Sequence, residues 1–231
     1  MKKVLGVAAL LALVLSITHL RAQGRAAGQM PPGAGARPGG PSVAAPDPSK
    51  PARLDITTGT TARYKVREQL AGISFPSDAV GTTDSVTGTI VVNPDGSIDV
   101  AKSKMTVDLR TIKSDQSMRD GYVERNTLET TKFPTMEFVP KRAVGLPSPL
   151  PSGMMAQAGF QLIGDMTLHG ETAEVTWNVV ATFGNDAVAG RATTMFPFAT
   201  FKMAKPSLAR LLSVDDKIEL EIEFKCKRSA G

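Results

Sequence analysis

Histidine and cysteine are scarce in this chain of 231 residues, which holds two histidines and one cysteine. Cys226 alone cannot form an internal disulfide, and it falls on the apolar side of an alternating segment, so we expect a buried thiol that packs as a small hydrophobic group. His169 is the histidine outside the first 23 residues. It has no Cys, Asp or second His at ligand spacing, so we expect it to bond the backbone of a turn at His169-Gly170.

Recognisable catalytic motifs are also missing. The sequence has no G-x-S-x-G nucleophile elbow and no glycine-rich phosphate loop after a strand. Arg119 and Asp120 are adjacent and are expected to form a local ion pair, but they lack a nucleophile or a second acid for catalysis. The sequence therefore predicts no catalytic residue, no metal site and no enzymatic activity; an esterase that depends on His169 is a distant alternative.

An excess of positive charge is absent from most of the chain. The formal net charge is +5, but six of the 27 basic residues and one of the 22 acidic residues precede Ala52, which leaves 21 of each from there on. No basic patch with interleaved aromatic residues is present, so the composition predicts no nucleic-acid partner.

The N-terminus carries the one long apolar run. Lys2 and Lys3 precede apolar residues 4–18, and small residues follow at 22–24. This pattern is typical of a secretory signal peptide over residues 1–23, and we expect a periplasmic or secreted protein. The run is shorter than the roughly 20 residues of a membrane span. An uncleaved anchor is the alternative, and no integral membrane domain is expected.

Residues 24–51 consist almost entirely of Gly, Pro and Ala with a few polar residues. Such a composition offers too little apolar surface to offset the entropy of ordering, so we expect a disordered tether. The stretch has no P-x-x-P motif with a basic anchor, which gives no sign of a docking partner for it.

Residues 52–228 alternate between apolar and polar positions, as strands with one buried face do. We expect about eight strands, from strand-like segments near 53–58, 62–69, 85–92, 97–109, 133–138, 160–168, 175–183, 187–203 and 218–226, with a loop over 70–84. Asp115 is expected to cap a short helix between strands, and Pro206 to start a second one through Leu212 before the last strand. An antiparallel sheet with one apolar face removes its edges by closing, so the prediction is an all-β, eight-stranded antiparallel barrel.

Methionine is frequent in the expected strands, and flexible Met side chains suit a wall that adapts to a long apolar ligand. On composition alone, the alternative that these methionines simply fill a solid core is equally favoured. The residues assigned to the inward face by alternation, and proposed as the cavity lining, are Met105, Val107, Met136, Phe138, Met166, Leu168, Trp177, Val179 and Phe198.

Five ordered segments between Leu54 and Phe224 resemble the YceI family of bacterial periplasmic proteins. They are Val86-Thr87-Gly88-Thr89-Ile90, Val107-Asp108-Leu109 followed by Met118-Arg119-Asp120, residues 132–138 (KFPTMEF), residues 164–172 (GDMTLHGET) and residues 214–220 (VDDKIEL). The resemblance implies a lipocalin-like barrel that holds an isoprenoid or another lipid without catalysis. Family patterns near Gly59-Thr60-Thr61 and Phe198-Ala199-Thr200-Phe201 are altered, which implies a more apolar interior.

The function expected from these observations is binding or carriage of a long apolar amphiphile, such as an isoprenoid quinone, inside the barrel. The partner is then a lipid-like small molecule, and no cofactor is needed apart from that bound lipid. The alternative is a solid-cored structural or envelope-stress interaction module without a ligand. Association into a homodimer is left open.

Overall fold

The computed structural model describes residues 44–153, 156–207 and 209–231. The expected signal peptide (1–23) and most of the expected tether (24–51) lie outside the described residues. The described strands are β1 (Ala52–Ile56), β2 (Thr61–Leu70), β3 (Ser77–Thr83), β4 (Val86–Val92), β5 (Lys104–Asp108), β6 (Lys113–Ser114), β7 (Thr135–Val144), β8 (Ala156–Leu168), β9 (Glu171–Phe183), β10 (Ala187–Phe196) and β11 (Leu211–Ala230). The helical segments are η1 (Val100–Lys102), η2 (Leu109–Thr111), α1 (Ser117–Tyr122), η3 (Val123–Thr127) and η4 (Phe198–Phe201).

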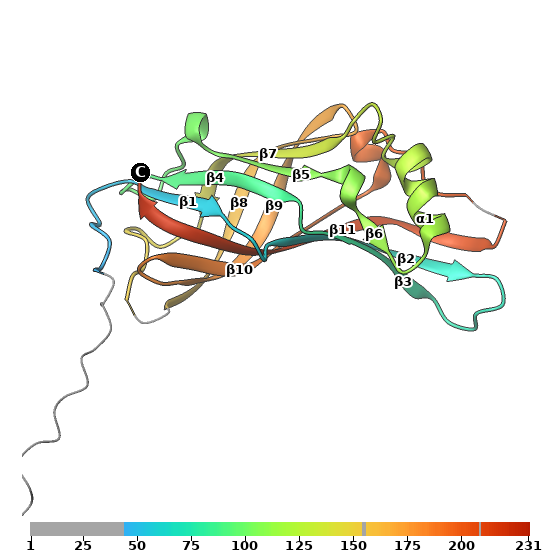
Figure 1. The fold of residues 1–231 in the computed structure, drawn as a ribbon, viewed down its shortest axis with the longest axis horizontal. Helices are drawn as coiled ribbons and strands as arrows, with labels where there is room; N and C mark the ends of the chain where they lie inside the picture. Colours follow the sequence, from blue (N-terminus) through green and yellow to red (C-terminus); the bar gives the residue numbers. More distant parts are fainter. Residues whose placement is uncertain (1–43, 154–155, 208) are drawn as a thin grey trace, which may run out of the picture. The chain divides into compact units, whose positions relative to one another are not determined.

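Eight of these strands close into a ring (Figure 1). Neighbours run antiparallel in the order β1-β4-β5-β7-β8-β9-β10-β11, and β11 pairs back onto β1. The expected eight-stranded antiparallel barrel is therefore confirmed. The ring places the apolar side of each strand in one shared interior and leaves no open edge among its members.

The long strand β11 pairs with β1 near its C-terminal end and with β2 earlier along its length. Its last residues pair with β1, from Ile56↔Cys226 to Ala52↔Ala230, and its earlier residues pair with β2, from Thr61↔Glu223 onward. Beyond β2 the sheet continues through β3 to β6, which pairs with β3 at two positions. Past β6 the ladder stops, and α1 and η3 follow before β7 (Figure 1). One end of the barrel is therefore walled partly by helix and partly by sheet.

The break between β1 and β2 is held by side chains. Thr57 and Thr60 both donate their hydroxyls to the carbonyl of Lys225, and the Thr60 hydroxyl accepts a bond from the Lys225 N–H. Gly59 lies between them with φ +85°, a conformation that glycine adopts without a Cβ clash. The chain thereby bends while staying bonded to β11.

The nine residues assigned to the inward face are all buried. Their relative exposure runs from 0% at Met166 to 7% at Met105. Trp177 and Phe138 pack edge to face with ring centroids 6.0 Å apart, an arrangement that aromatic quadrupoles favour. Cys226 is buried as expected, and its burial raises the pKa of the thiol to about 12.

The polar face of β11 differs from a simple solvated face. Glu221 is 4% exposed, because Arg63 from β2 and Arg191 from β10 cover its carboxylate at 3.1 and 3.5 Å. Lys65 lies 3.6 Å from the same carboxylate. Cross-strand cations therefore shield this carboxylate on the outer surface of the barrel.

Several expected elements differ in the structure. The expected strand 97–109 is a strand only over β5 and contains η1, and the expected strand 187–203 ends with β10 and is followed by η4. The expected loop 70–84 contains β3, which pairs with β2 from Ala62↔Thr83 to Glu68↔Ser77 although its residues are mostly small and polar. The expected helix from Pro206 to Leu212 does not form in the described part of that segment. Instead β11 begins at Leu211, and the N–H of Ala71 bonds the carbonyl of Arg210, so the backbone is satisfied by the neighbouring strand.

The expected helix after Asp115 is present as α1, but its stabilising contacts differ from those expected. Gln116 is the N-cap residue and makes no side-chain capping bond. Asp115 pairs with Arg119 one turn later, and Asp120 accepts bonds from the N–H and hydroxyl of Ser114. The expected Arg119–Asp120 ion pair is therefore wrong.

Candidate functional site

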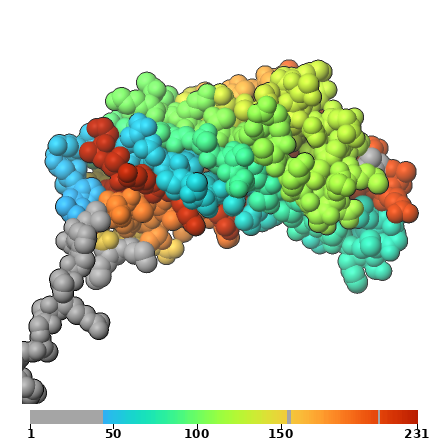
Figure 2. Space-filling view, viewed as in Figure 1, coloured from blue at the N-terminus to red at the C-terminus, as the bar shows by residue number. Residues whose placement is uncertain are grey.

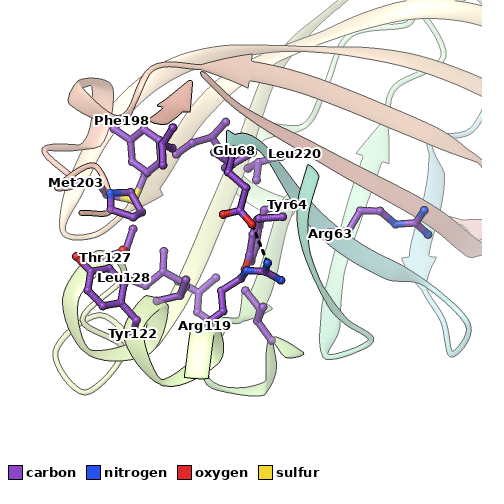
Figure 3. A pocket seen from close by; sticks show the side chains of 18 of the residues that line it. Arg63, Tyr64, Glu68, Arg119, Tyr122, Thr127, Leu128, Phe198, Met203 and Leu220 are labelled. Carbon is purple, nitrogen blue, oxygen red and sulfur yellow. Dashed lines mark hydrogen bonds and ion pairs between the residues drawn. The ribbon is translucent and has the colours of Figure 1, made fainter. Parts of the chain in front are cut away.

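A cavity of about 660 Å³ lies at the α1 end of the barrel. This volume falls within the range of sites that hold drug-sized ligands. The lining comes from β2, β3, α1, η3, the segment around η4 and β11, and most of its side chains are apolar (Figure 3). The cavity lies where the sheet beyond the ring ends after β6, and α1 and η3 form part of its wall there in place of a strand.

A second cavity of about 90 Å³ lies deeper in the barrel and has an entirely apolar lining. Trp177 and Ile222 line both cavities. These two side chains therefore form the boundary between the wide space at the α1 end and the narrower space beyond it.

The opposite end of the barrel is closed by the connection between β7 and β8. Leu146 and Leu150 from this connection line the smaller cavity. Arg228 is 7% exposed and donates to the carbonyls of Leu150, Pro151 and Gly184. Burial lowers the pKa of this guanidinium. A buried arginine thus holds the closing loop in place through backbone acceptors.

A close ion pair between β2 and α1 lies in the wall of the large cavity, which Arg63, Arg125, Arg210 and Glu221 also line. The Arg119 guanidinium lies 2.8 Å from the Glu68 carboxylate, and the two side chains are 18% and 10% exposed. Figure 3 shows them facing each other, with Tyr64 beside Arg119 and Arg63 pointing away. Although burial lowers the pKa of Arg119, the carboxylates of Glu68 and Asp115 outweigh it and raise that pKa. The pair joins α1 to β2.

Tyr64 brings a neutral polar group to the same region. Burial raises the pKa of its hydroxyl to about 12, and the nearby carboxylates add to the shift against the opposing effect of Arg119. The hydroxyl therefore stays protonated at neutral pH and can donate to an acceptor on a ligand.

Two buried polar atoms in the cavity wall have no hydrogen-bond partner among the described residues. They are the Thr127 hydroxyl and the indole N–H of Trp177, and both residues line the large cavity. A buried donor without an acceptor costs free energy. A ligand that carries an oxygen acceptor would remove that cost.

The predicted lining residues divide between the two cavities. Val107, Met136, Leu168, Trp177 and Phe198 line the large one. Met105, Phe138 and Val179, with Trp177 again, line the small one. Met166 is buried but lines neither, so its role as a cavity residue has no support from the geometry.

Many residues that line the large cavity were not predicted from the sequence. The missed lining residues include Ala62, Tyr64, Val66, Glu68, Leu70, Met118, Arg119, Tyr122, Thr127 and Leu128. A signal was present in β2, where Glu68 follows Ala62, Tyr64 and Val66 at the same two-residue spacing. A carboxylate on an apolar face indicates a partner or a site.

The geometry of the described residues gives no support to a metal site. The His, Cys, Asp and Glu side chains among them form no group of three or more that could hold a metal ion. His169 has its Nδ1 3.1 Å from the Phe201 carbonyl and its Nε2 3.4 Å from Glu129. It therefore ties its turn to η4 and to Glu129, which follows η3, rather than to the turn's own backbone. Within the same described ranges, no helix is long and apolar enough to cross a bilayer.

The sequence matches the model of the YceI-like domain over residues 55–226, most of the chain. The chain belongs to the YceI family. No curated protein is similar enough in sequence to match it.

Solved structures share the YceI barrel at low identity. A polyisoprenoid binding domain from Saccharophagus degradans aligns with a TM-score of 0.58 and 10% identity over 77% of this chain and 98% of its own. BcnA from Burkholderia cenocepacia aligns with a TM-score of 0.51 and 15% identity over 71% and 95%. The YCEI protein of Campylobacter jejuni aligns with a TM-score of 0.50 and 14% identity over 69% and 90%. At these identities the likeness supports the fold alone.

Proposed function

We propose that this YceI protein binds and carries a long apolar amphiphile, with its hydrocarbon chain inside the barrel. The observation that carries the proposal is the 660 Å³ cavity with a mainly apolar wall. Burial of hydrocarbon in such a space is favourable at roughly 25 cal/mol per Å². The same cavity counts against the alternative of a solid-cored structural module.

An isoprenoid quinone is the ligand class that fits the polar groups best. The chain of such a molecule needs an apolar tunnel, and its ring needs hydrogen-bond donors for two carbonyl oxygens. Trp177, Thr127 and Tyr64 each bring a donor to the large cavity, and the first two have no partner of their own. The similarity to a polyisoprenoid binding domain supports the isoprenoid chain.

The role is carriage without catalysis. Glu68 and Arg119 neutralise each other at 2.8 Å, so this pair serves a structural role. The buried Cys226 thiol has a raised pKa and is a poor nucleophile. Membership of the YceI family and the apolar N-terminal run support a periplasmic or secreted site of action. Association of two copies stays a prediction.

Purified protein should be extracted into organic solvent and analysed by mass spectrometry, and delipidated protein should then be offered an isoprenoid quinone. We expect a co-purified lipid and saturable uptake of the quinone. Val66 lines the large cavity, so Val66→Phe should reduce uptake; Val180 is 51% exposed on β9, so Val180→Phe is the matched control that should bind like the original protein. Absence of lipid from repeated preparations, together with no uptake, would overturn the proposal.

A further inference from the structure

Large apolar side chains are exposed at the α1 end of the barrel. Met118 on α1 is 85% exposed, Phe75 is 78% exposed, Leu212 is 67% exposed and Ile73 is 53% exposed. Phe75 and Ile73 belong to the hairpin between β2 and β3, and Leu212 to the start of β11. The first three are the most exposed large hydrophobic residues of the described chain. We call these four side chains the apolar rim.

The rim borders the mouth of the cavity. Ile73 and Met118 line the large cavity, and so does Leu211, which precedes Leu212. The β2–β3 hairpin, α1 and the start of β11 lie at the same end of the barrel (Figures 1 and 2). The apolar wall of the cavity thus continues outward onto the surface.

Hydrogen bonds hold the hairpin in its exposed position. Ile73 donates its N–H to the Leu70 carbonyl at 3.2 Å, and the side-chain amide of Gln69 donates to the Ile73 carbonyl. Ala71 donates to the Arg210 carbonyl at 2.8 Å, which fixes the hairpin to the segment that precedes β11. The rim is therefore a set of anchored side chains, and it is presented to solvent by bonded backbone.

Exposed basic side chains occur at the same cavity as the apolar rim. Arg125 and Arg210 are exposed, line the mouth, and form no ion pair among the described residues. Lys205 is also exposed, and the sequence from Met203 to Leu212 contains no acidic residue. Nearby acids are mostly neutralised, since Asp78 pairs with Arg67 and Asp115 with Arg119, although Glu124 and Asp215 are exposed without such a pair.

We propose that the apolar rim docks the protein on the surface of a lipid bilayer, with Phe75, Met118 and Leu212 inserted among the acyl chains and Arg125 and Arg210 at anionic headgroups. Exposed apolar patches mark contact surfaces, and apolar groups flanked by cations are typical of interfacial membrane binding. The inference rests on the proposed function, because a water-insoluble ligand must leave and enter a membrane. Docking at the mouth lets the hydrocarbon chain pass between bilayer and cavity without crossing water.

Flotation with vesicles tests the docking. The vesicles consist of phosphatidylcholine, with or without phosphatidylglycerol. We expect the protein to float with both and to bind the anionic vesicles more tightly at low salt. The variant Phe75→Ser with Leu212→Ser changes rim residues that do not line the cavity, and it should lose roughly tenfold or more in vesicle affinity. The matched control, Val180→Ser with Met195→Ser, changes two exposed residues on the strands β9 and β10 and should bind like the original protein.

Transfer of a quinone separates docking from ligand binding. The rim variant should take up quinone from vesicles more slowly than the control, while uptake from a detergent dispersion should be equal in both. Arg125→Gln with Arg210→Gln should lose the preference for anionic vesicles only.

Equal flotation of rim variant and control, or no flotation of the original protein, would overturn the docking even if quinone binds from detergent. Flotation without any quinone binding would overturn the proposed function and leave the docking in place. Self-association of the protein through the rim, with no flotation, would assign the surface to a second copy instead.

Discussion

Trp177 lines both cavities, is 2% exposed, and its indole N–H has no acceptor among the described residues. The proposed quinone would supply that acceptor. Trp177→Phe keeps an aromatic ring and removes the donor, so quinone affinity should fall roughly five- to tenfold, the worth of about one hydrogen bond. The affinity for a hydrocarbon of the same chain length should change much less. Isothermal titration of both ligands measures the difference.

The control for this variant is Phe138→Leu. Phe138 packs against Trp177 at 6.0 Å and contributes no donor, so its loss should weaken quinone and hydrocarbon by similar factors. Equal effects of Trp177→Phe on the two ligands would show that the indole N–H takes no part in recognition.

The buried Cys226 thiol and the partly buried Tyr64 hydroxyl should make the protein less stable in alkali. The pKa of Cys226 is raised from 9.0 and that of Tyr64 from 10.0, each to about 12, chiefly by burial. The folded state holds both protons to higher pH than the unfolded state does. The free energy of unfolding should therefore be at its full value below pH 9 and fall between pH 9 and pH 12, by up to about 1.4 kcal/mol per pH unit for each group.

Urea unfolding from pH 8 to pH 12 checks this sensitivity. Relative to the original protein, Cys226→Ala should flatten the decline from pH 9 upward, and Tyr64→Phe should flatten it from pH 10 upward. Parallel curves for all three proteins would mean that other groups govern the alkaline limit.

The helix α1 is tied to β2 by the Arg119–Glu68 pair. Arg119→Met would leave the Glu68 carboxylate in a site where its side chain is 10% exposed, without its cation. We expect a loss of about 2 to 4 kcal/mol in the free energy of unfolding, toward the low end for a broken buried pair because solvent reaches the guanidinium. Glu68→Leu combined with Arg119→Met should recover most of it, since no buried charge then remains.

Chemical unfolding of the two single variants and the double variant forms a complete cycle. Arg142→Met is the control, because Arg142 and Glu174 pair at 3.4 Å with both side chains about half exposed, and its loss should cost under about 1 kcal/mol. A double variant no more stable than Arg119→Met alone would show that α1 is held by packing and not by the pair.

Strands with a marked period of two were predictable, and elements held by a neighbour were not. Val175, Trp177, Val179 and Ala181 are buried at every second position, and β9 follows that pattern over its length. β3 has few apolar side chains and exists because β2 offers it a ladder. The segment after Pro206 likewise joins the sheet through the backbone of Ala71 instead of forming a helix. Such pairings depend on which strands meet, which local sequence does not contain.

Alternation in the sequence predicts which way a side chain faces but says nothing about the volume of the space that the barrel encloses. Eight of the nine residues assigned to the inward face lie buried on strands, and Phe198 is buried in η4, outside any strand. The predicted lining omitted the side chains that β2, α1 and η3 contribute to the large cavity. The space arises where the ladder stops after β6 and helical segments take the place of a strand. The large cavity therefore depends on how these segments are arranged in the assembled barrel, which the local sequence does not contain.

Replacing one valine in each cavity by phenylalanine tests whether the large cavity has room for a ligand. Val66 lines the 660 Å³ cavity, and Val179 lines the 90 Å³ cavity, so Val→Phe adds the same atoms to a roomy site and to a tight one. Val66→Phe should change the unfolding midpoint of the ligand-free protein little, because the ring enters open space. Val179→Phe should cost roughly 1–3 kcal/mol, because it overpacks a core with little room. Quinone uptake should fall most for Val66→Phe, whose ring occupies the proposed site. If both variants lost stability equally and neither changed uptake, the interior would be packed throughout and the amphiphile would have no place in it.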